Sequence, residues 1–261
     1  MSGLPRPELH KDAKFVFLSD WDGTITDRDS NDLLIDTLGM GPDNRRKLNA
    51  TVVTGEGNFR DTFSEMLRSI KAPFAECTET LRQNIRLDPG FEEFYYWCKA
   101  HGIPVIIVSS GMAPNIRAVL SHLMGAEEAA QIEIIANDVK FTDPEGEGKT
   151  WEIVWRHPES GFGHDKSQSI IPYRELAQRP TIFFAGDGVS DLSAARHADL
   201  LFTKVAPGVD SDLLKYCKRE GIPHVRFATF SDILADVKKV VGGEATTQQV
   251  IEAAAEEEAK N

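Results

Sequence analysis

Short apolar runs alternate along this chain with longer segments in which apolar residues recur every three or four positions. Continuous apolar runs are typical of strands buried on both faces of a sheet, and they occur here at 15–18, 103–108, 181–185 and 200–202. Further strands are predicted over 132–141, 149–156 and 224–227. Because helical patterns separate most of these strands, the sequence predicts an α/β fold with a mostly parallel sheet and right-handed crossovers.

A block of predicted helices interrupts this alternation between residues 29 and 87. Asp29 or Ser30 caps the first helix, which ends at the turn 39–42 and is followed by a more polar helix. The apolar residues expected to be buried are Leu33, Leu34 and Leu38 in the first helix, Phe59, Phe63, Leu67 and Ile70 in the third, and Phe74, Cys77, Leu81 and Ile85 in the fourth. The block therefore predicts a small helical subdomain inserted after the first strand.

The predicted domain organisation follows from these boundaries. Residues 14–28 and 88–242 form the α/β core, and residues 29–87 form the inserted helical subdomain, which would act as a cap. The polar segment 1–13, with two prolines, is expected to be a loose leader. The Ala- and Glu-rich tail, 243–261, is expected to be a frayed helix or a disordered end without a catalytic role.

Composition and charge narrow the class of protein. The chain has 261 residues, 41% of them hydrophobic, which is ample for a full core. A formal net charge of −12 disfavours nucleic acid and anionic membranes as partners, and it leaves carboxylates available for a divalent metal. Three widely spaced cysteines argue against a disulfide framework, and no secretory or membrane-spanning segment is visible. We therefore expect a cytoplasmic protein that is a monomer or a weak dimer.

Polar residues follow three of the buried strands directly. Asp20 and Asp22 follow the first strand, the next strand ends on Ser109, Ser110 and Gly111, and a third leads to Asp187 and Asp191, while a further loop carries Lys166. Ligands of open α/β sheets bind just outside the carboxyl ends of the strands. If these strands are neighbours, their polar residues converge at one edge of the sheet.

A calcium-binding loop is the alternative interpretation of closely spaced aspartates. The EF-hand loop requires Gly at its sixth position and Glu at its twelfth. Counted from Asp20, those positions hold Ile25 and Asn31; counted from Asp27, they hold Asp32 and Leu38. The EF-hand interpretation is therefore disfavoured.

The converging residues contain every group that phosphoryl transfer needs. A carboxylate can attack phosphorus and form an aspartyl-phosphate. Mg²⁺ prefers oxygen ligands, typically one or two carboxylates together with the phosphate. A hydroxyl, backbone N–H groups and a lysine ammonium can stabilise the negative charge that spreads over the transferring group. The sequence thus predicts a magnesium-dependent enzyme with a small-molecule phosphomonoester as its substrate.

These motifs resemble those of the haloacid dehalogenase (HAD) superfamily. The run 20–24 is similar to its first motif, and Ser109, Lys166 and the run 186–191 match the second, third and fourth motifs in order. The resemblance implies the HAD fold, a Rossmann-like mostly parallel sheet core, with residues 29–87 as a C1-type cap. It implies Asp20 as nucleophile and Asp22 as the acid that protonates the leaving alkoxide and later deprotonates water.

The same resemblance implies the remaining roles. Ser109 and Lys166 would hold phosphoryl oxygens, together with Ser110 and Gly111. Asp20, the backbone carbonyl of Asp22 and Asp187 would bind Mg²⁺, with Asp191 supporting that site. Because an alcohol leaving group needs a proton, an acid at position 22 favours hydrolysis over dehalogenation.

A closer resemblance covers residues 14–242 and concerns fungal polyol-phosphate phosphatases. It rests on the runs 29–32, 85–91, 108–112, 162–167 and 186–195. This group is related to phosphoserine phosphatases and to the phosphatases of methionine salvage. The resemblance implies phosphorylated sugar alcohols such as mannitol 1-phosphate or sorbitol 6-phosphate as substrates, and we expect the cap residues Asp29, Asn31 and Arg60 to face their hydroxyls.

Two kinds of alternative stay open at this point. The first is another phosphatase, either of the methionine-salvage type or a phosphoserine phosphatase. Phosphoserine phosphatases use a Glu and an Arg of the cap to bind the substrate's amine and carboxylate, and the corresponding positions here hold Asp29 and Met66. A missing arginine disfavours phosphoserine as the substrate. The second alternative is a regulatory module that is phosphorylated on Asp20 without turnover, and Asp22 and the cap argue against it, since such a module needs neither a general acid nor a lid.

Overall fold

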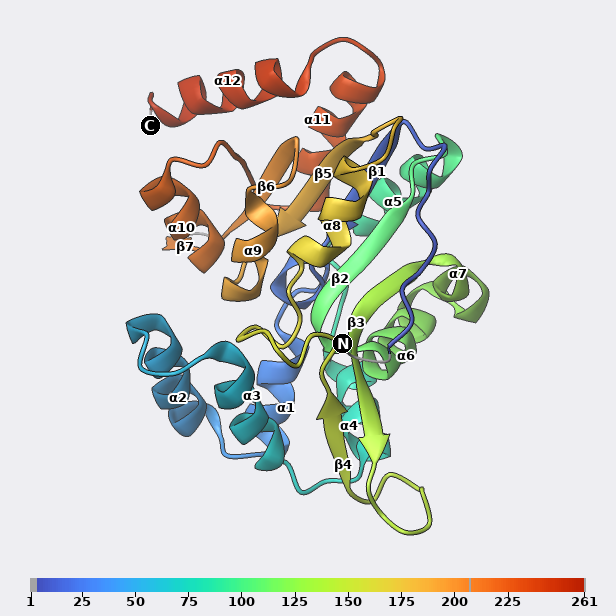
Figure 1. Ribbon diagram of the computed structural model, residues 1–261, viewed down its shortest axis with the longest axis vertical. Coiled ribbons are helices and arrows are strands. Elements are labelled where there is room, and N and C mark those ends of the chain that lie inside the picture. Colours follow the sequence, from blue (N-terminus) through green and yellow to red (C-terminus); the bar gives the residue numbers. More distant parts are fainter. Residues whose placement is uncertain (1–3, 207, 261) are drawn as a thin grey trace. The chain divides into compact units, whose positions relative to one another are not determined.

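The computed structural model describes residues 4–206 and 208–260 and divides them into two compact units. The first, called unit 1, contains residues 4–7, 26–86 and 109–165; the second, called unit 2, contains residues 8–25, 87–108 and 166–260. The chain therefore passes between the units several times, and unit 1 combines the predicted cap helices with a later part of the chain (Figure 1).

A parallel sheet forms the centre of unit 2. Its middle strand β1 (Phe15–Ser19) pairs in parallel with β2 (Val105–Met112) and with β5 (Thr181–Gly186). Next to β5 lies β6 (Leu200–Ala206), which pairs in parallel with β8 (Val225–Phe227) and antiparallel with the short β7 (Val209–Asp210). The predicted α/β class with a mostly parallel sheet is thereby confirmed. Neighbouring strands β1 and β5 bring the residues after Ser19 and Gly186 to the same edge.

Aromatic side chains join this sheet to two helices on one of its faces. The Phe17 ring of β1 lies 4.6 Å from that of Phe94 in α5 (Phe91–Ala100) and 6.2 Å from that of Phe230 in α11 (Phe230–Val241). Figure 1 shows α8 (Ser167–Arg174) and α9 (Leu192–Ala195) in front of the sheet, so both faces are covered. Burial on both faces explains why the central strands contain continuous apolar runs.

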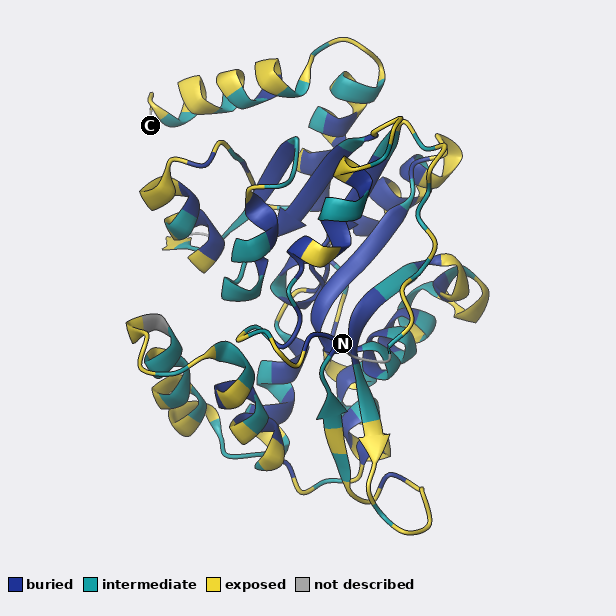
Figure 2. Ribbon diagram, viewed as in Figure 1, coloured by how far each residue is buried: buried dark blue, intermediate teal, exposed yellow. Residues whose placement is uncertain are grey.

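Two further helices complete unit 2: α10 (Asp212–Glu220) and α12 (Thr247–Glu258). Residues of the tail thus form a helix, which begins with a capping box between Thr246 and Gln249. One of its residues, Val250, is buried, and Glu258 forms ion pairs with Lys218 and Arg226. Figure 2 shows the difference between this largely exposed helix and the buried strands.

Unit 1 consists of helices and an antiparallel hairpin. The strands β3 (Glu133–Phe141) and β4 (Trp151–Val154) form the hairpin. Its helices are α1 (Ser30–Leu38), α2 (Pro42–Thr54), α3 (Phe59–Arg68), α4 (Phe74–Asn84), α6 (Ala113–Met124) and α7 (Ala126–Gln131). Phe74 of α4 lies 5.6 Å from Phe141 and 5.5 Å from Trp151, ring centroid to ring centroid, so α4 packs on the hairpin.

The predicted buried faces match the structure in α4 and mostly in α3, but not in α1. In α3 and α4 the apolar residues from Phe63 onward are buried, as expected, whereas Phe59 is half-buried. In α1, however, Leu33 and Leu38 are only half-buried, and the prediction for them was wrong. The buried face there consists of Ser30, Asn31, Leu34 and Ile35. Because two of these residues are polar, hydrophobicity alone places the face incorrectly.

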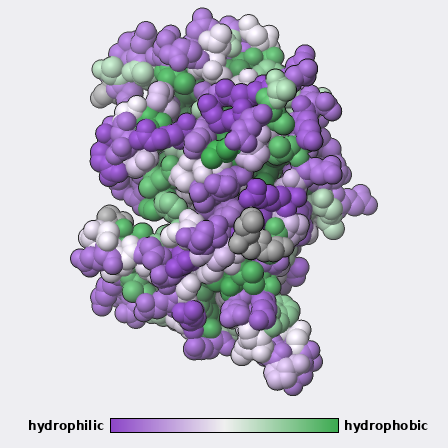
Figure 3. Space-filling model, in the orientation of Figure 1, coloured by the Kyte–Doolittle hydropathy of each residue, from purple (hydrophilic) through white to green (hydrophobic). Residues whose placement is uncertain are grey.

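The surface of the described residues is mostly hydrophilic. Three large hydrophobic side chains among them are exposed: Tyr96, Phe141 and Val209. The face drawn in Figure 3 shows apolar residues scattered among hydrophilic ones. None of the helices that the structure describes combines the length and the apolar character needed to cross a membrane.

Candidate active site

The loop that follows β1 carries the first pair of predicted catalytic residues. Asp20 is held at the end of the strand by a hydrogen bond from its backbone N–H to the carbonyl of Ala185, at 2.8 Å. Asp22 breaks the helical geometry of the turn η1 (Trp21–Ile25) with φ −70° and ψ 123°, and Gly23 follows with φ +71°. Both aspartates are buried, with 4% and 8% of their surfaces exposed.

Gly23 is required by its surroundings as well as by its backbone angle. A Cβ atom added there would lie 2.6 Å from Oδ2 of Asp187, closer than a real contact allows. Residues other than glycine also adopt a φ of this sign with difficulty. The loop after β1 and the loop after β5 therefore touch at this position.

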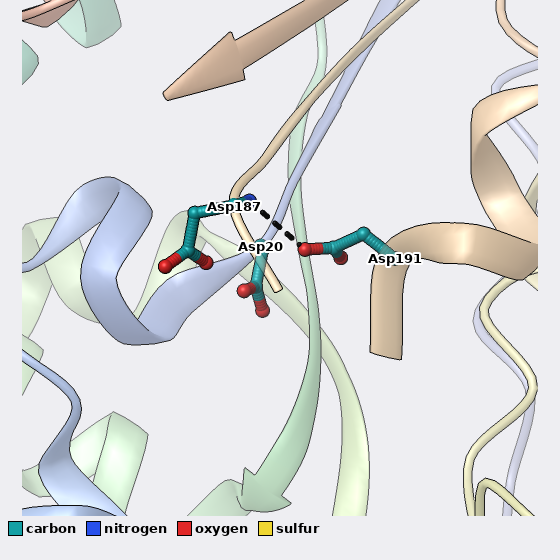
Figure 4. A group of neighbouring side chains, drawn as sticks. All are labelled: Asp20, Asp187 and Asp191. Atoms are coloured by element: carbon teal, nitrogen blue, oxygen red, sulfur yellow. Dashed lines mark hydrogen bonds between the residues drawn. The ribbon is translucent and has the colours of Figure 1, made fainter. Parts of the chain in front are cut away.

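Lys166 lies between two buried carboxylates. Its ammonium donates to Oδ1 of Asp20 at 2.5 Å and to Oδ1 of Asp191 at 2.7 Å, and its side chain is fully buried. The second oxygen of Asp191 accepts the backbone N–H groups of Asp187 and Gly188, each at 3.0 Å. Figure 4 shows Asp20, Asp187 and Asp191 gathered at this point, with the bond from the Asp187 N–H to Asp191 dashed.

The charges of this cluster do not balance. Burial and the neighbouring carboxylate of Asp191 raise the pKa of Asp20 to about 7, although Lys166 acts in the opposite direction. For Lys166, burial lowers the pKa, but Asp191 and Asp20 together outweigh this and raise it above the usual range. With Lys166 and all three aspartates charged, the cluster carries an excess of negative charge, which a cation would neutralise.

The three aspartates suit a hard divalent cation. Each offers one carboxylate oxygen, and these oxygens all lie within 4.8 Å of one another. Carboxylate oxygens are the ligands that Mg²⁺ prefers, and a ligand set without sulfur or imidazole disfavours softer transition metals. The excess negative charge of the cluster also favours a cation. The absence of a side chain at Gly23 leaves space for the Asp187 carboxylate beside it.

The predicted phosphate-binding residues Ser109, Ser110 and Gly111 lie in unit 1. Oγ of Ser109 accepts the N–H of Gly111 at 2.9 Å, and the Ser109 carbonyl lies 2.7 Å from Nδ1 of His164, which must donate. Oγ of Ser110 is buried and has no hydrogen-bond partner among the described residues. A buried hydroxyl in this state is available to a ligand oxygen.

The cap residues proposed from the sequence are also in unit 1, and their role stays a prediction. Asp29 caps α1 by accepting the N–H of Asp32 at 2.8 Å, and Asn31 is buried in the first turn of that helix. The guanidinium of Arg60 donates to Asp61 and to the carbonyl of Pro158, while its backbone N–H donates to Gly161. Arg60 thus fastens the start of α3 to the loop that precedes Lys166 in sequence.

Two residues near the predicted motifs were missed in the sequence. Thr24 is fully buried, and its hydroxyl donates to Oδ1 of Asp187 at 3.3 Å. Its position directly after the two aspartates was the available signal. Asn137 of β3 is fully buried and donates to the carbonyl of Ser110 at 2.7 Å. Nothing in the pattern around Asn137 marks it, because its role depends on the fold.

Comparison with known proteins identifies a family and two similar fungal proteins. Residues 17–196 match the family described as haloacid dehalogenase-like hydrolase. The chain is 44% identical over 248 residues to polyol phosphate phosphatase PYP1 of Saccharomyces cerevisiae, which covers 92% of this chain and 99% of that protein. It is 48% identical over 232 residues to Pdp3-interacting factor 1 of Schizosaccharomyces pombe, covering 88% and 97% of the two chains.

A more distant relative is the 2-hydroxy-3-keto-5-methylthiopentenyl-1-phosphate phosphatase of Geobacillus kaustophilus, 28% identical over 235 residues, with 87% of this chain and 97% of that protein covered. Among solved structures, a phospho-aspartyl intermediate analogue of phosphoserine phosphatase matches with a TM-score of 0.62 and 17% identity, covering 85% of this chain and 98% of the other. At that identity the match supports the fold alone.

The match over residues 17–196 and the 44% identity to a protein named as a phosphatase show the family. The chain belongs to the haloacid dehalogenase-like hydrolase family and is one of its phosphatases.

Proposed function

We propose that the protein is a Mg²⁺-dependent hydrolase of phosphorylated sugar alcohols that acts through an aspartyl-phosphate on Asp20. The observation that carries the mechanism is the cluster of Lys166 between Asp20 and Asp191, with Asp187 adjacent. The substrate class rests on the resemblance to the yeast polyol phosphate phosphatase, which is so named.

In the first step, a carboxylate oxygen of Asp20 attacks phosphorus and forms a new O–P bond. The bond from phosphorus to the substrate's alkoxide breaks, and the alkoxide takes a proton from Asp22. Asp22 is buried, with 8% of its surface exposed, and lies two residues after the nucleophile. Lys166, bonded to Asp20, would stabilise the charge that develops on the phosphoryl group.

In the second step, water attacks the phosphorus of the aspartyl-phosphate. Asp22, now a carboxylate, removes a proton from that water, and the bond between phosphorus and Asp20 breaks. Asp20 and the acid form of Asp22 are thereby restored, and inorganic phosphate leaves. In this proposal Asp20 and Asp22, two residues apart at the end of β1, supply the nucleophile and the acid of the cycle.

The acidic cluster and the resemblance to the HAD motifs together support a set of residues for the metal. Asp20, Asp187 and the backbone carbonyl of Asp22 would hold Mg²⁺, with Asp191 orienting Asp187 and Lys166. When bound, Mg²⁺ supplies positive charge that neutralises the carboxylates and the phosphate oxygens. Asp191 accepts hydrogen bonds from the ammonium of Lys166 and from the N–H groups of Asp187 and Gly188, and so holds these groups in place.

For substrate selection we propose Ser110 and the predicted cap, residues 29–87. The unpartnered hydroxyl of Ser110 supports a role in holding a phosphoryl oxygen. Asp29, Asn31 and Arg60 remain our candidates for the substrate's hydroxyl groups. Alanine variants of these three should change kcat/KM unequally across substrates; equal values for all substrates would contradict the assignment.

The proposal is tested by phosphate release with Mg²⁺ from mannitol 1-phosphate, sorbitol 6-phosphate, phosphoserine, phosphoglycolate and glycerol phosphates. We expect the highest kcat/KM for the two hexitol phosphates and a loss of roughly 10⁴-fold or more in Asp20→Asn. Preference for phosphoserine would replace the substrate class and keep the mechanism. Equal thermal midpoints for the wild-type protein and Asp20→Asn would show that the loss of activity is not caused by unfolding.

If a folded wild-type protein is phosphorylated on Asp20 by a small phosphoryl donor but releases no phosphate, the acceptor-module alternative is correct and the enzyme proposal fails. The cytoplasmic location and the monomeric or weakly dimeric state stay predictions. Fractionation and sedimentation of the purified protein test them separately.

A further inference from the structure

A partly buried ion pair between Asp88 and Lys204, outside the four catalytic motifs, lies where the chain returns to unit 2. The chain leaves unit 2 after Ile25 and returns at Leu87, and Asp88 follows at once. The N–H of Asp88 donates to the carbonyl of Ile25 at 2.7 Å, so the departing and returning ends of unit 2 are bonded to each other. Asp88 is 4% exposed and is far from Asp20 in sequence.

Asp88 accepts hydrogen bonds from three different elements. Its Oδ1 receives the N–H of Gly90, at the start of α5, at 3.0 Å, and that of Phe230, at the start of α11, at 2.8 Å. Its Oδ2 receives the ammonium of Lys204, in β6, at 2.6 Å. Two helix N-termini and an ammonium therefore converge on this one carboxylate.

Gly90 shows how little space surrounds this junction. A Cβ atom added there would lie 2.4 Å from the backbone nitrogen of Ser231 in α11. The starts of α5 and α11 are therefore in direct backbone contact beside Asp88. Its three hydrogen bonds and this close packing hold the Asp88 side chain in one conformation, so Asp88 can serve as a rigid anchor.

Lys204 extends the anchor toward the catalytic loop. Its side chain is 18% exposed, and its ammonium lies 5.0 Å from the centroid of the Phe227 ring. Besides Asp88, the ammonium has the carbonyl oxygen of Thr24 as an acceptor, at 3.5 Å. The hydroxyl of Thr24 in turn donates to Oδ1 of Asp187 at 3.3 Å. Hydrogen bonds thus run from Asp88 through Lys204 and Thr24 to a carboxylate of the acidic cluster.

We infer that Lys204 and Asp88 are positioning residues, which fix Thr24 and thereby the loop from Asp20 to Ile25 against Asp187. The inference rests on the function proposed above for that loop, since its value to the enzyme is the geometry of Asp20, Asp22 and Asp187. Neither residue belongs to the acidic cluster or to the residues proposed above to bind the substrate. A displacement of about 1 Å in a catalytic group costs on the order of 100-fold in rate, which is why such an anchor matters.

The test compares Lys204→Met, which keeps the aliphatic stem, with Lys204→Arg, which restores a positive charge. For the methionine variant we expect kcat to fall by roughly 10- to 100-fold with a smaller change in KM, and partial recovery in the arginine variant. Lys218→Met is the matched control, because Lys218 also pairs with carboxylates of unit 2, namely those of Asp210 and Glu258. It should retain wild-type kcat.

A second readout does not depend on activity. Amide hydrogen exchange of residues 20–25 should be faster in Lys204→Met than in the wild-type protein, while exchange in α10 stays unchanged. Adding Asp88→Asn to Lys204→Met should cost less than the sum of the single losses, because the two residues act as one unit. Should Asp88→Asn alone fail to fold, Lys204→Met and Lys204→Gln still decide the question.

The outcomes separate this inference from the proposed function. Wild-type kcat and unchanged exchange in Lys204→Met overturn the positioning role, whatever the substrate is. A uniform loss, in which α10 exchanges faster and the arginine variant recovers nothing, also overturns it, because it indicates general destabilisation. If the wild-type protein shows no turnover, the function fails, and the exchange experiment alone decides the role of Lys204.

Discussion

At the scale of single residues, Gly23 limits what the loop after β1 can contain. Its φ of +71° and the 2.6 Å that would separate an added Cβ atom from Oδ2 of Asp187 are separate restrictions. The first raises the energy of the loop for any other residue, and the second displaces a carboxylate of the acidic cluster. The effects of the two restrictions can be measured separately by comparing Gly23 with a glycine that also has a positive φ but has no atom close to an added Cβ.

Gly221 provides that comparison. It ends α10 with φ +63°, and nothing lies within 4 Å of an added Cβ. We expect Gly221→Ala and Gly23→Ala each to destabilise the protein by about 1–2 kcal/mol from the backbone angle, measured by denaturant unfolding. Only Gly23→Ala should also raise the Mg²⁺ concentration that gives half-maximal activity. Equal Mg²⁺ dependence in both variants would show that Asp187 tolerates the added atom.

Asp22 is predicted to act as a general acid, and this role has a kinetic signature. A phosphate ester with a good leaving group, such as a nitrophenolate, needs no proton when its bond breaks, whereas an alkoxide does. Asp22→Asn should therefore lower kcat for an alkyl phosphate by roughly 10²- to 10⁴-fold and for nitrophenyl phosphate by clearly less. Rapid-quench measurement of the first turnover isolates that step. The same loss for both substrates would assign Asp22 a structural role instead.

At the scale of secondary-structure elements, one guanidinium holds α1 and α2 together. Arg45 of α2 pairs with both oxygens of Asp36 and with Asp32, at 2.5–2.9 Å. Asp29 also lies nearby, since it accepts the N–H of Asp32. Burial and the charges of Asp29 and Asp36 raise the pKa of Asp32 to about 7, against the effect of Arg45. The guanidinium of Arg45 thus faces a group of neighbouring carboxylates.

This arrangement makes the stability of the protein depend on pH in a definite direction. The pKa of Asp32 is about 7 in the folded protein and near 4 when unfolded, so the folded state binds more protons between these values. The group therefore stabilises the fold most below about pH 4, and this contribution is lost as the pH rises to 7. In Asp32→Asn the thermal midpoint should exceed that of the wild-type protein at pH 8, and the difference should shrink toward pH 4.

Asp43→Asn serves as the control for this experiment. Asp43 lies in α2 and is 86% exposed, so removing its charge should not produce a pH-dependent gain. If Asp32→Asn is instead less stable than the wild-type protein at every pH, the ion pair with Arg45 outweighs the repulsion among the carboxylates. The pKa of Asp32 would then lie below its usual range.

The order and type of most elements were predictable from the sequence, because apolar runs and apolar faces have different periods. The face of α1 was not, since Ser30 and Asn31 are buried with Leu34 and Ile35. The short helix α7 was missed as well; its six residues bury only Ala129 and give no amphipathic pattern. The grouping of residues 109–165 with the predicted cap helices in unit 1 depends on contacts such as Arg60 to Gly161, which join segments distant in sequence.

At the scale of the whole molecule, the sequence indicated which residues come together, but not the net charge of the cluster that they form. Asp20, Lys166, Asp187 and Asp191 follow strand ends or a loop, so their convergence in unit 2 could be anticipated from topology. The excess negative charge and its effect on the pKa of Asp20 depend on burial, which only the folded structure gives. Residues such as Lys204 carry no motif and are found only through their contacts.

The excess charge predicts that cation binding and folding are coupled. A ligand that binds only the folded state stabilises it by about 2.7 kcal/mol when its free concentration is 100 times its Kd. Mg²⁺ should therefore raise the thermal midpoint of the wild-type protein. Because the pKa of Asp20 is about 7 without metal, protons compete with Mg²⁺ below that pH, and the increase should be larger at pH 8 than at pH 6.

Two variants show whether the acidic cluster is responsible. Asp187→Asn removes one of the three carboxylates that lie within 4.8 Å of one another, so the Mg²⁺-dependent increase should largely disappear. Asp212→Asn removes an exposed carboxylate of α10, paired with Lys215, and should keep the full increase. Differential scanning calorimetry with and without Mg²⁺ measures both. An equal increase in Asp187→Asn would mean that Mg²⁺ stabilises this acidic chain by binding elsewhere than at the cluster.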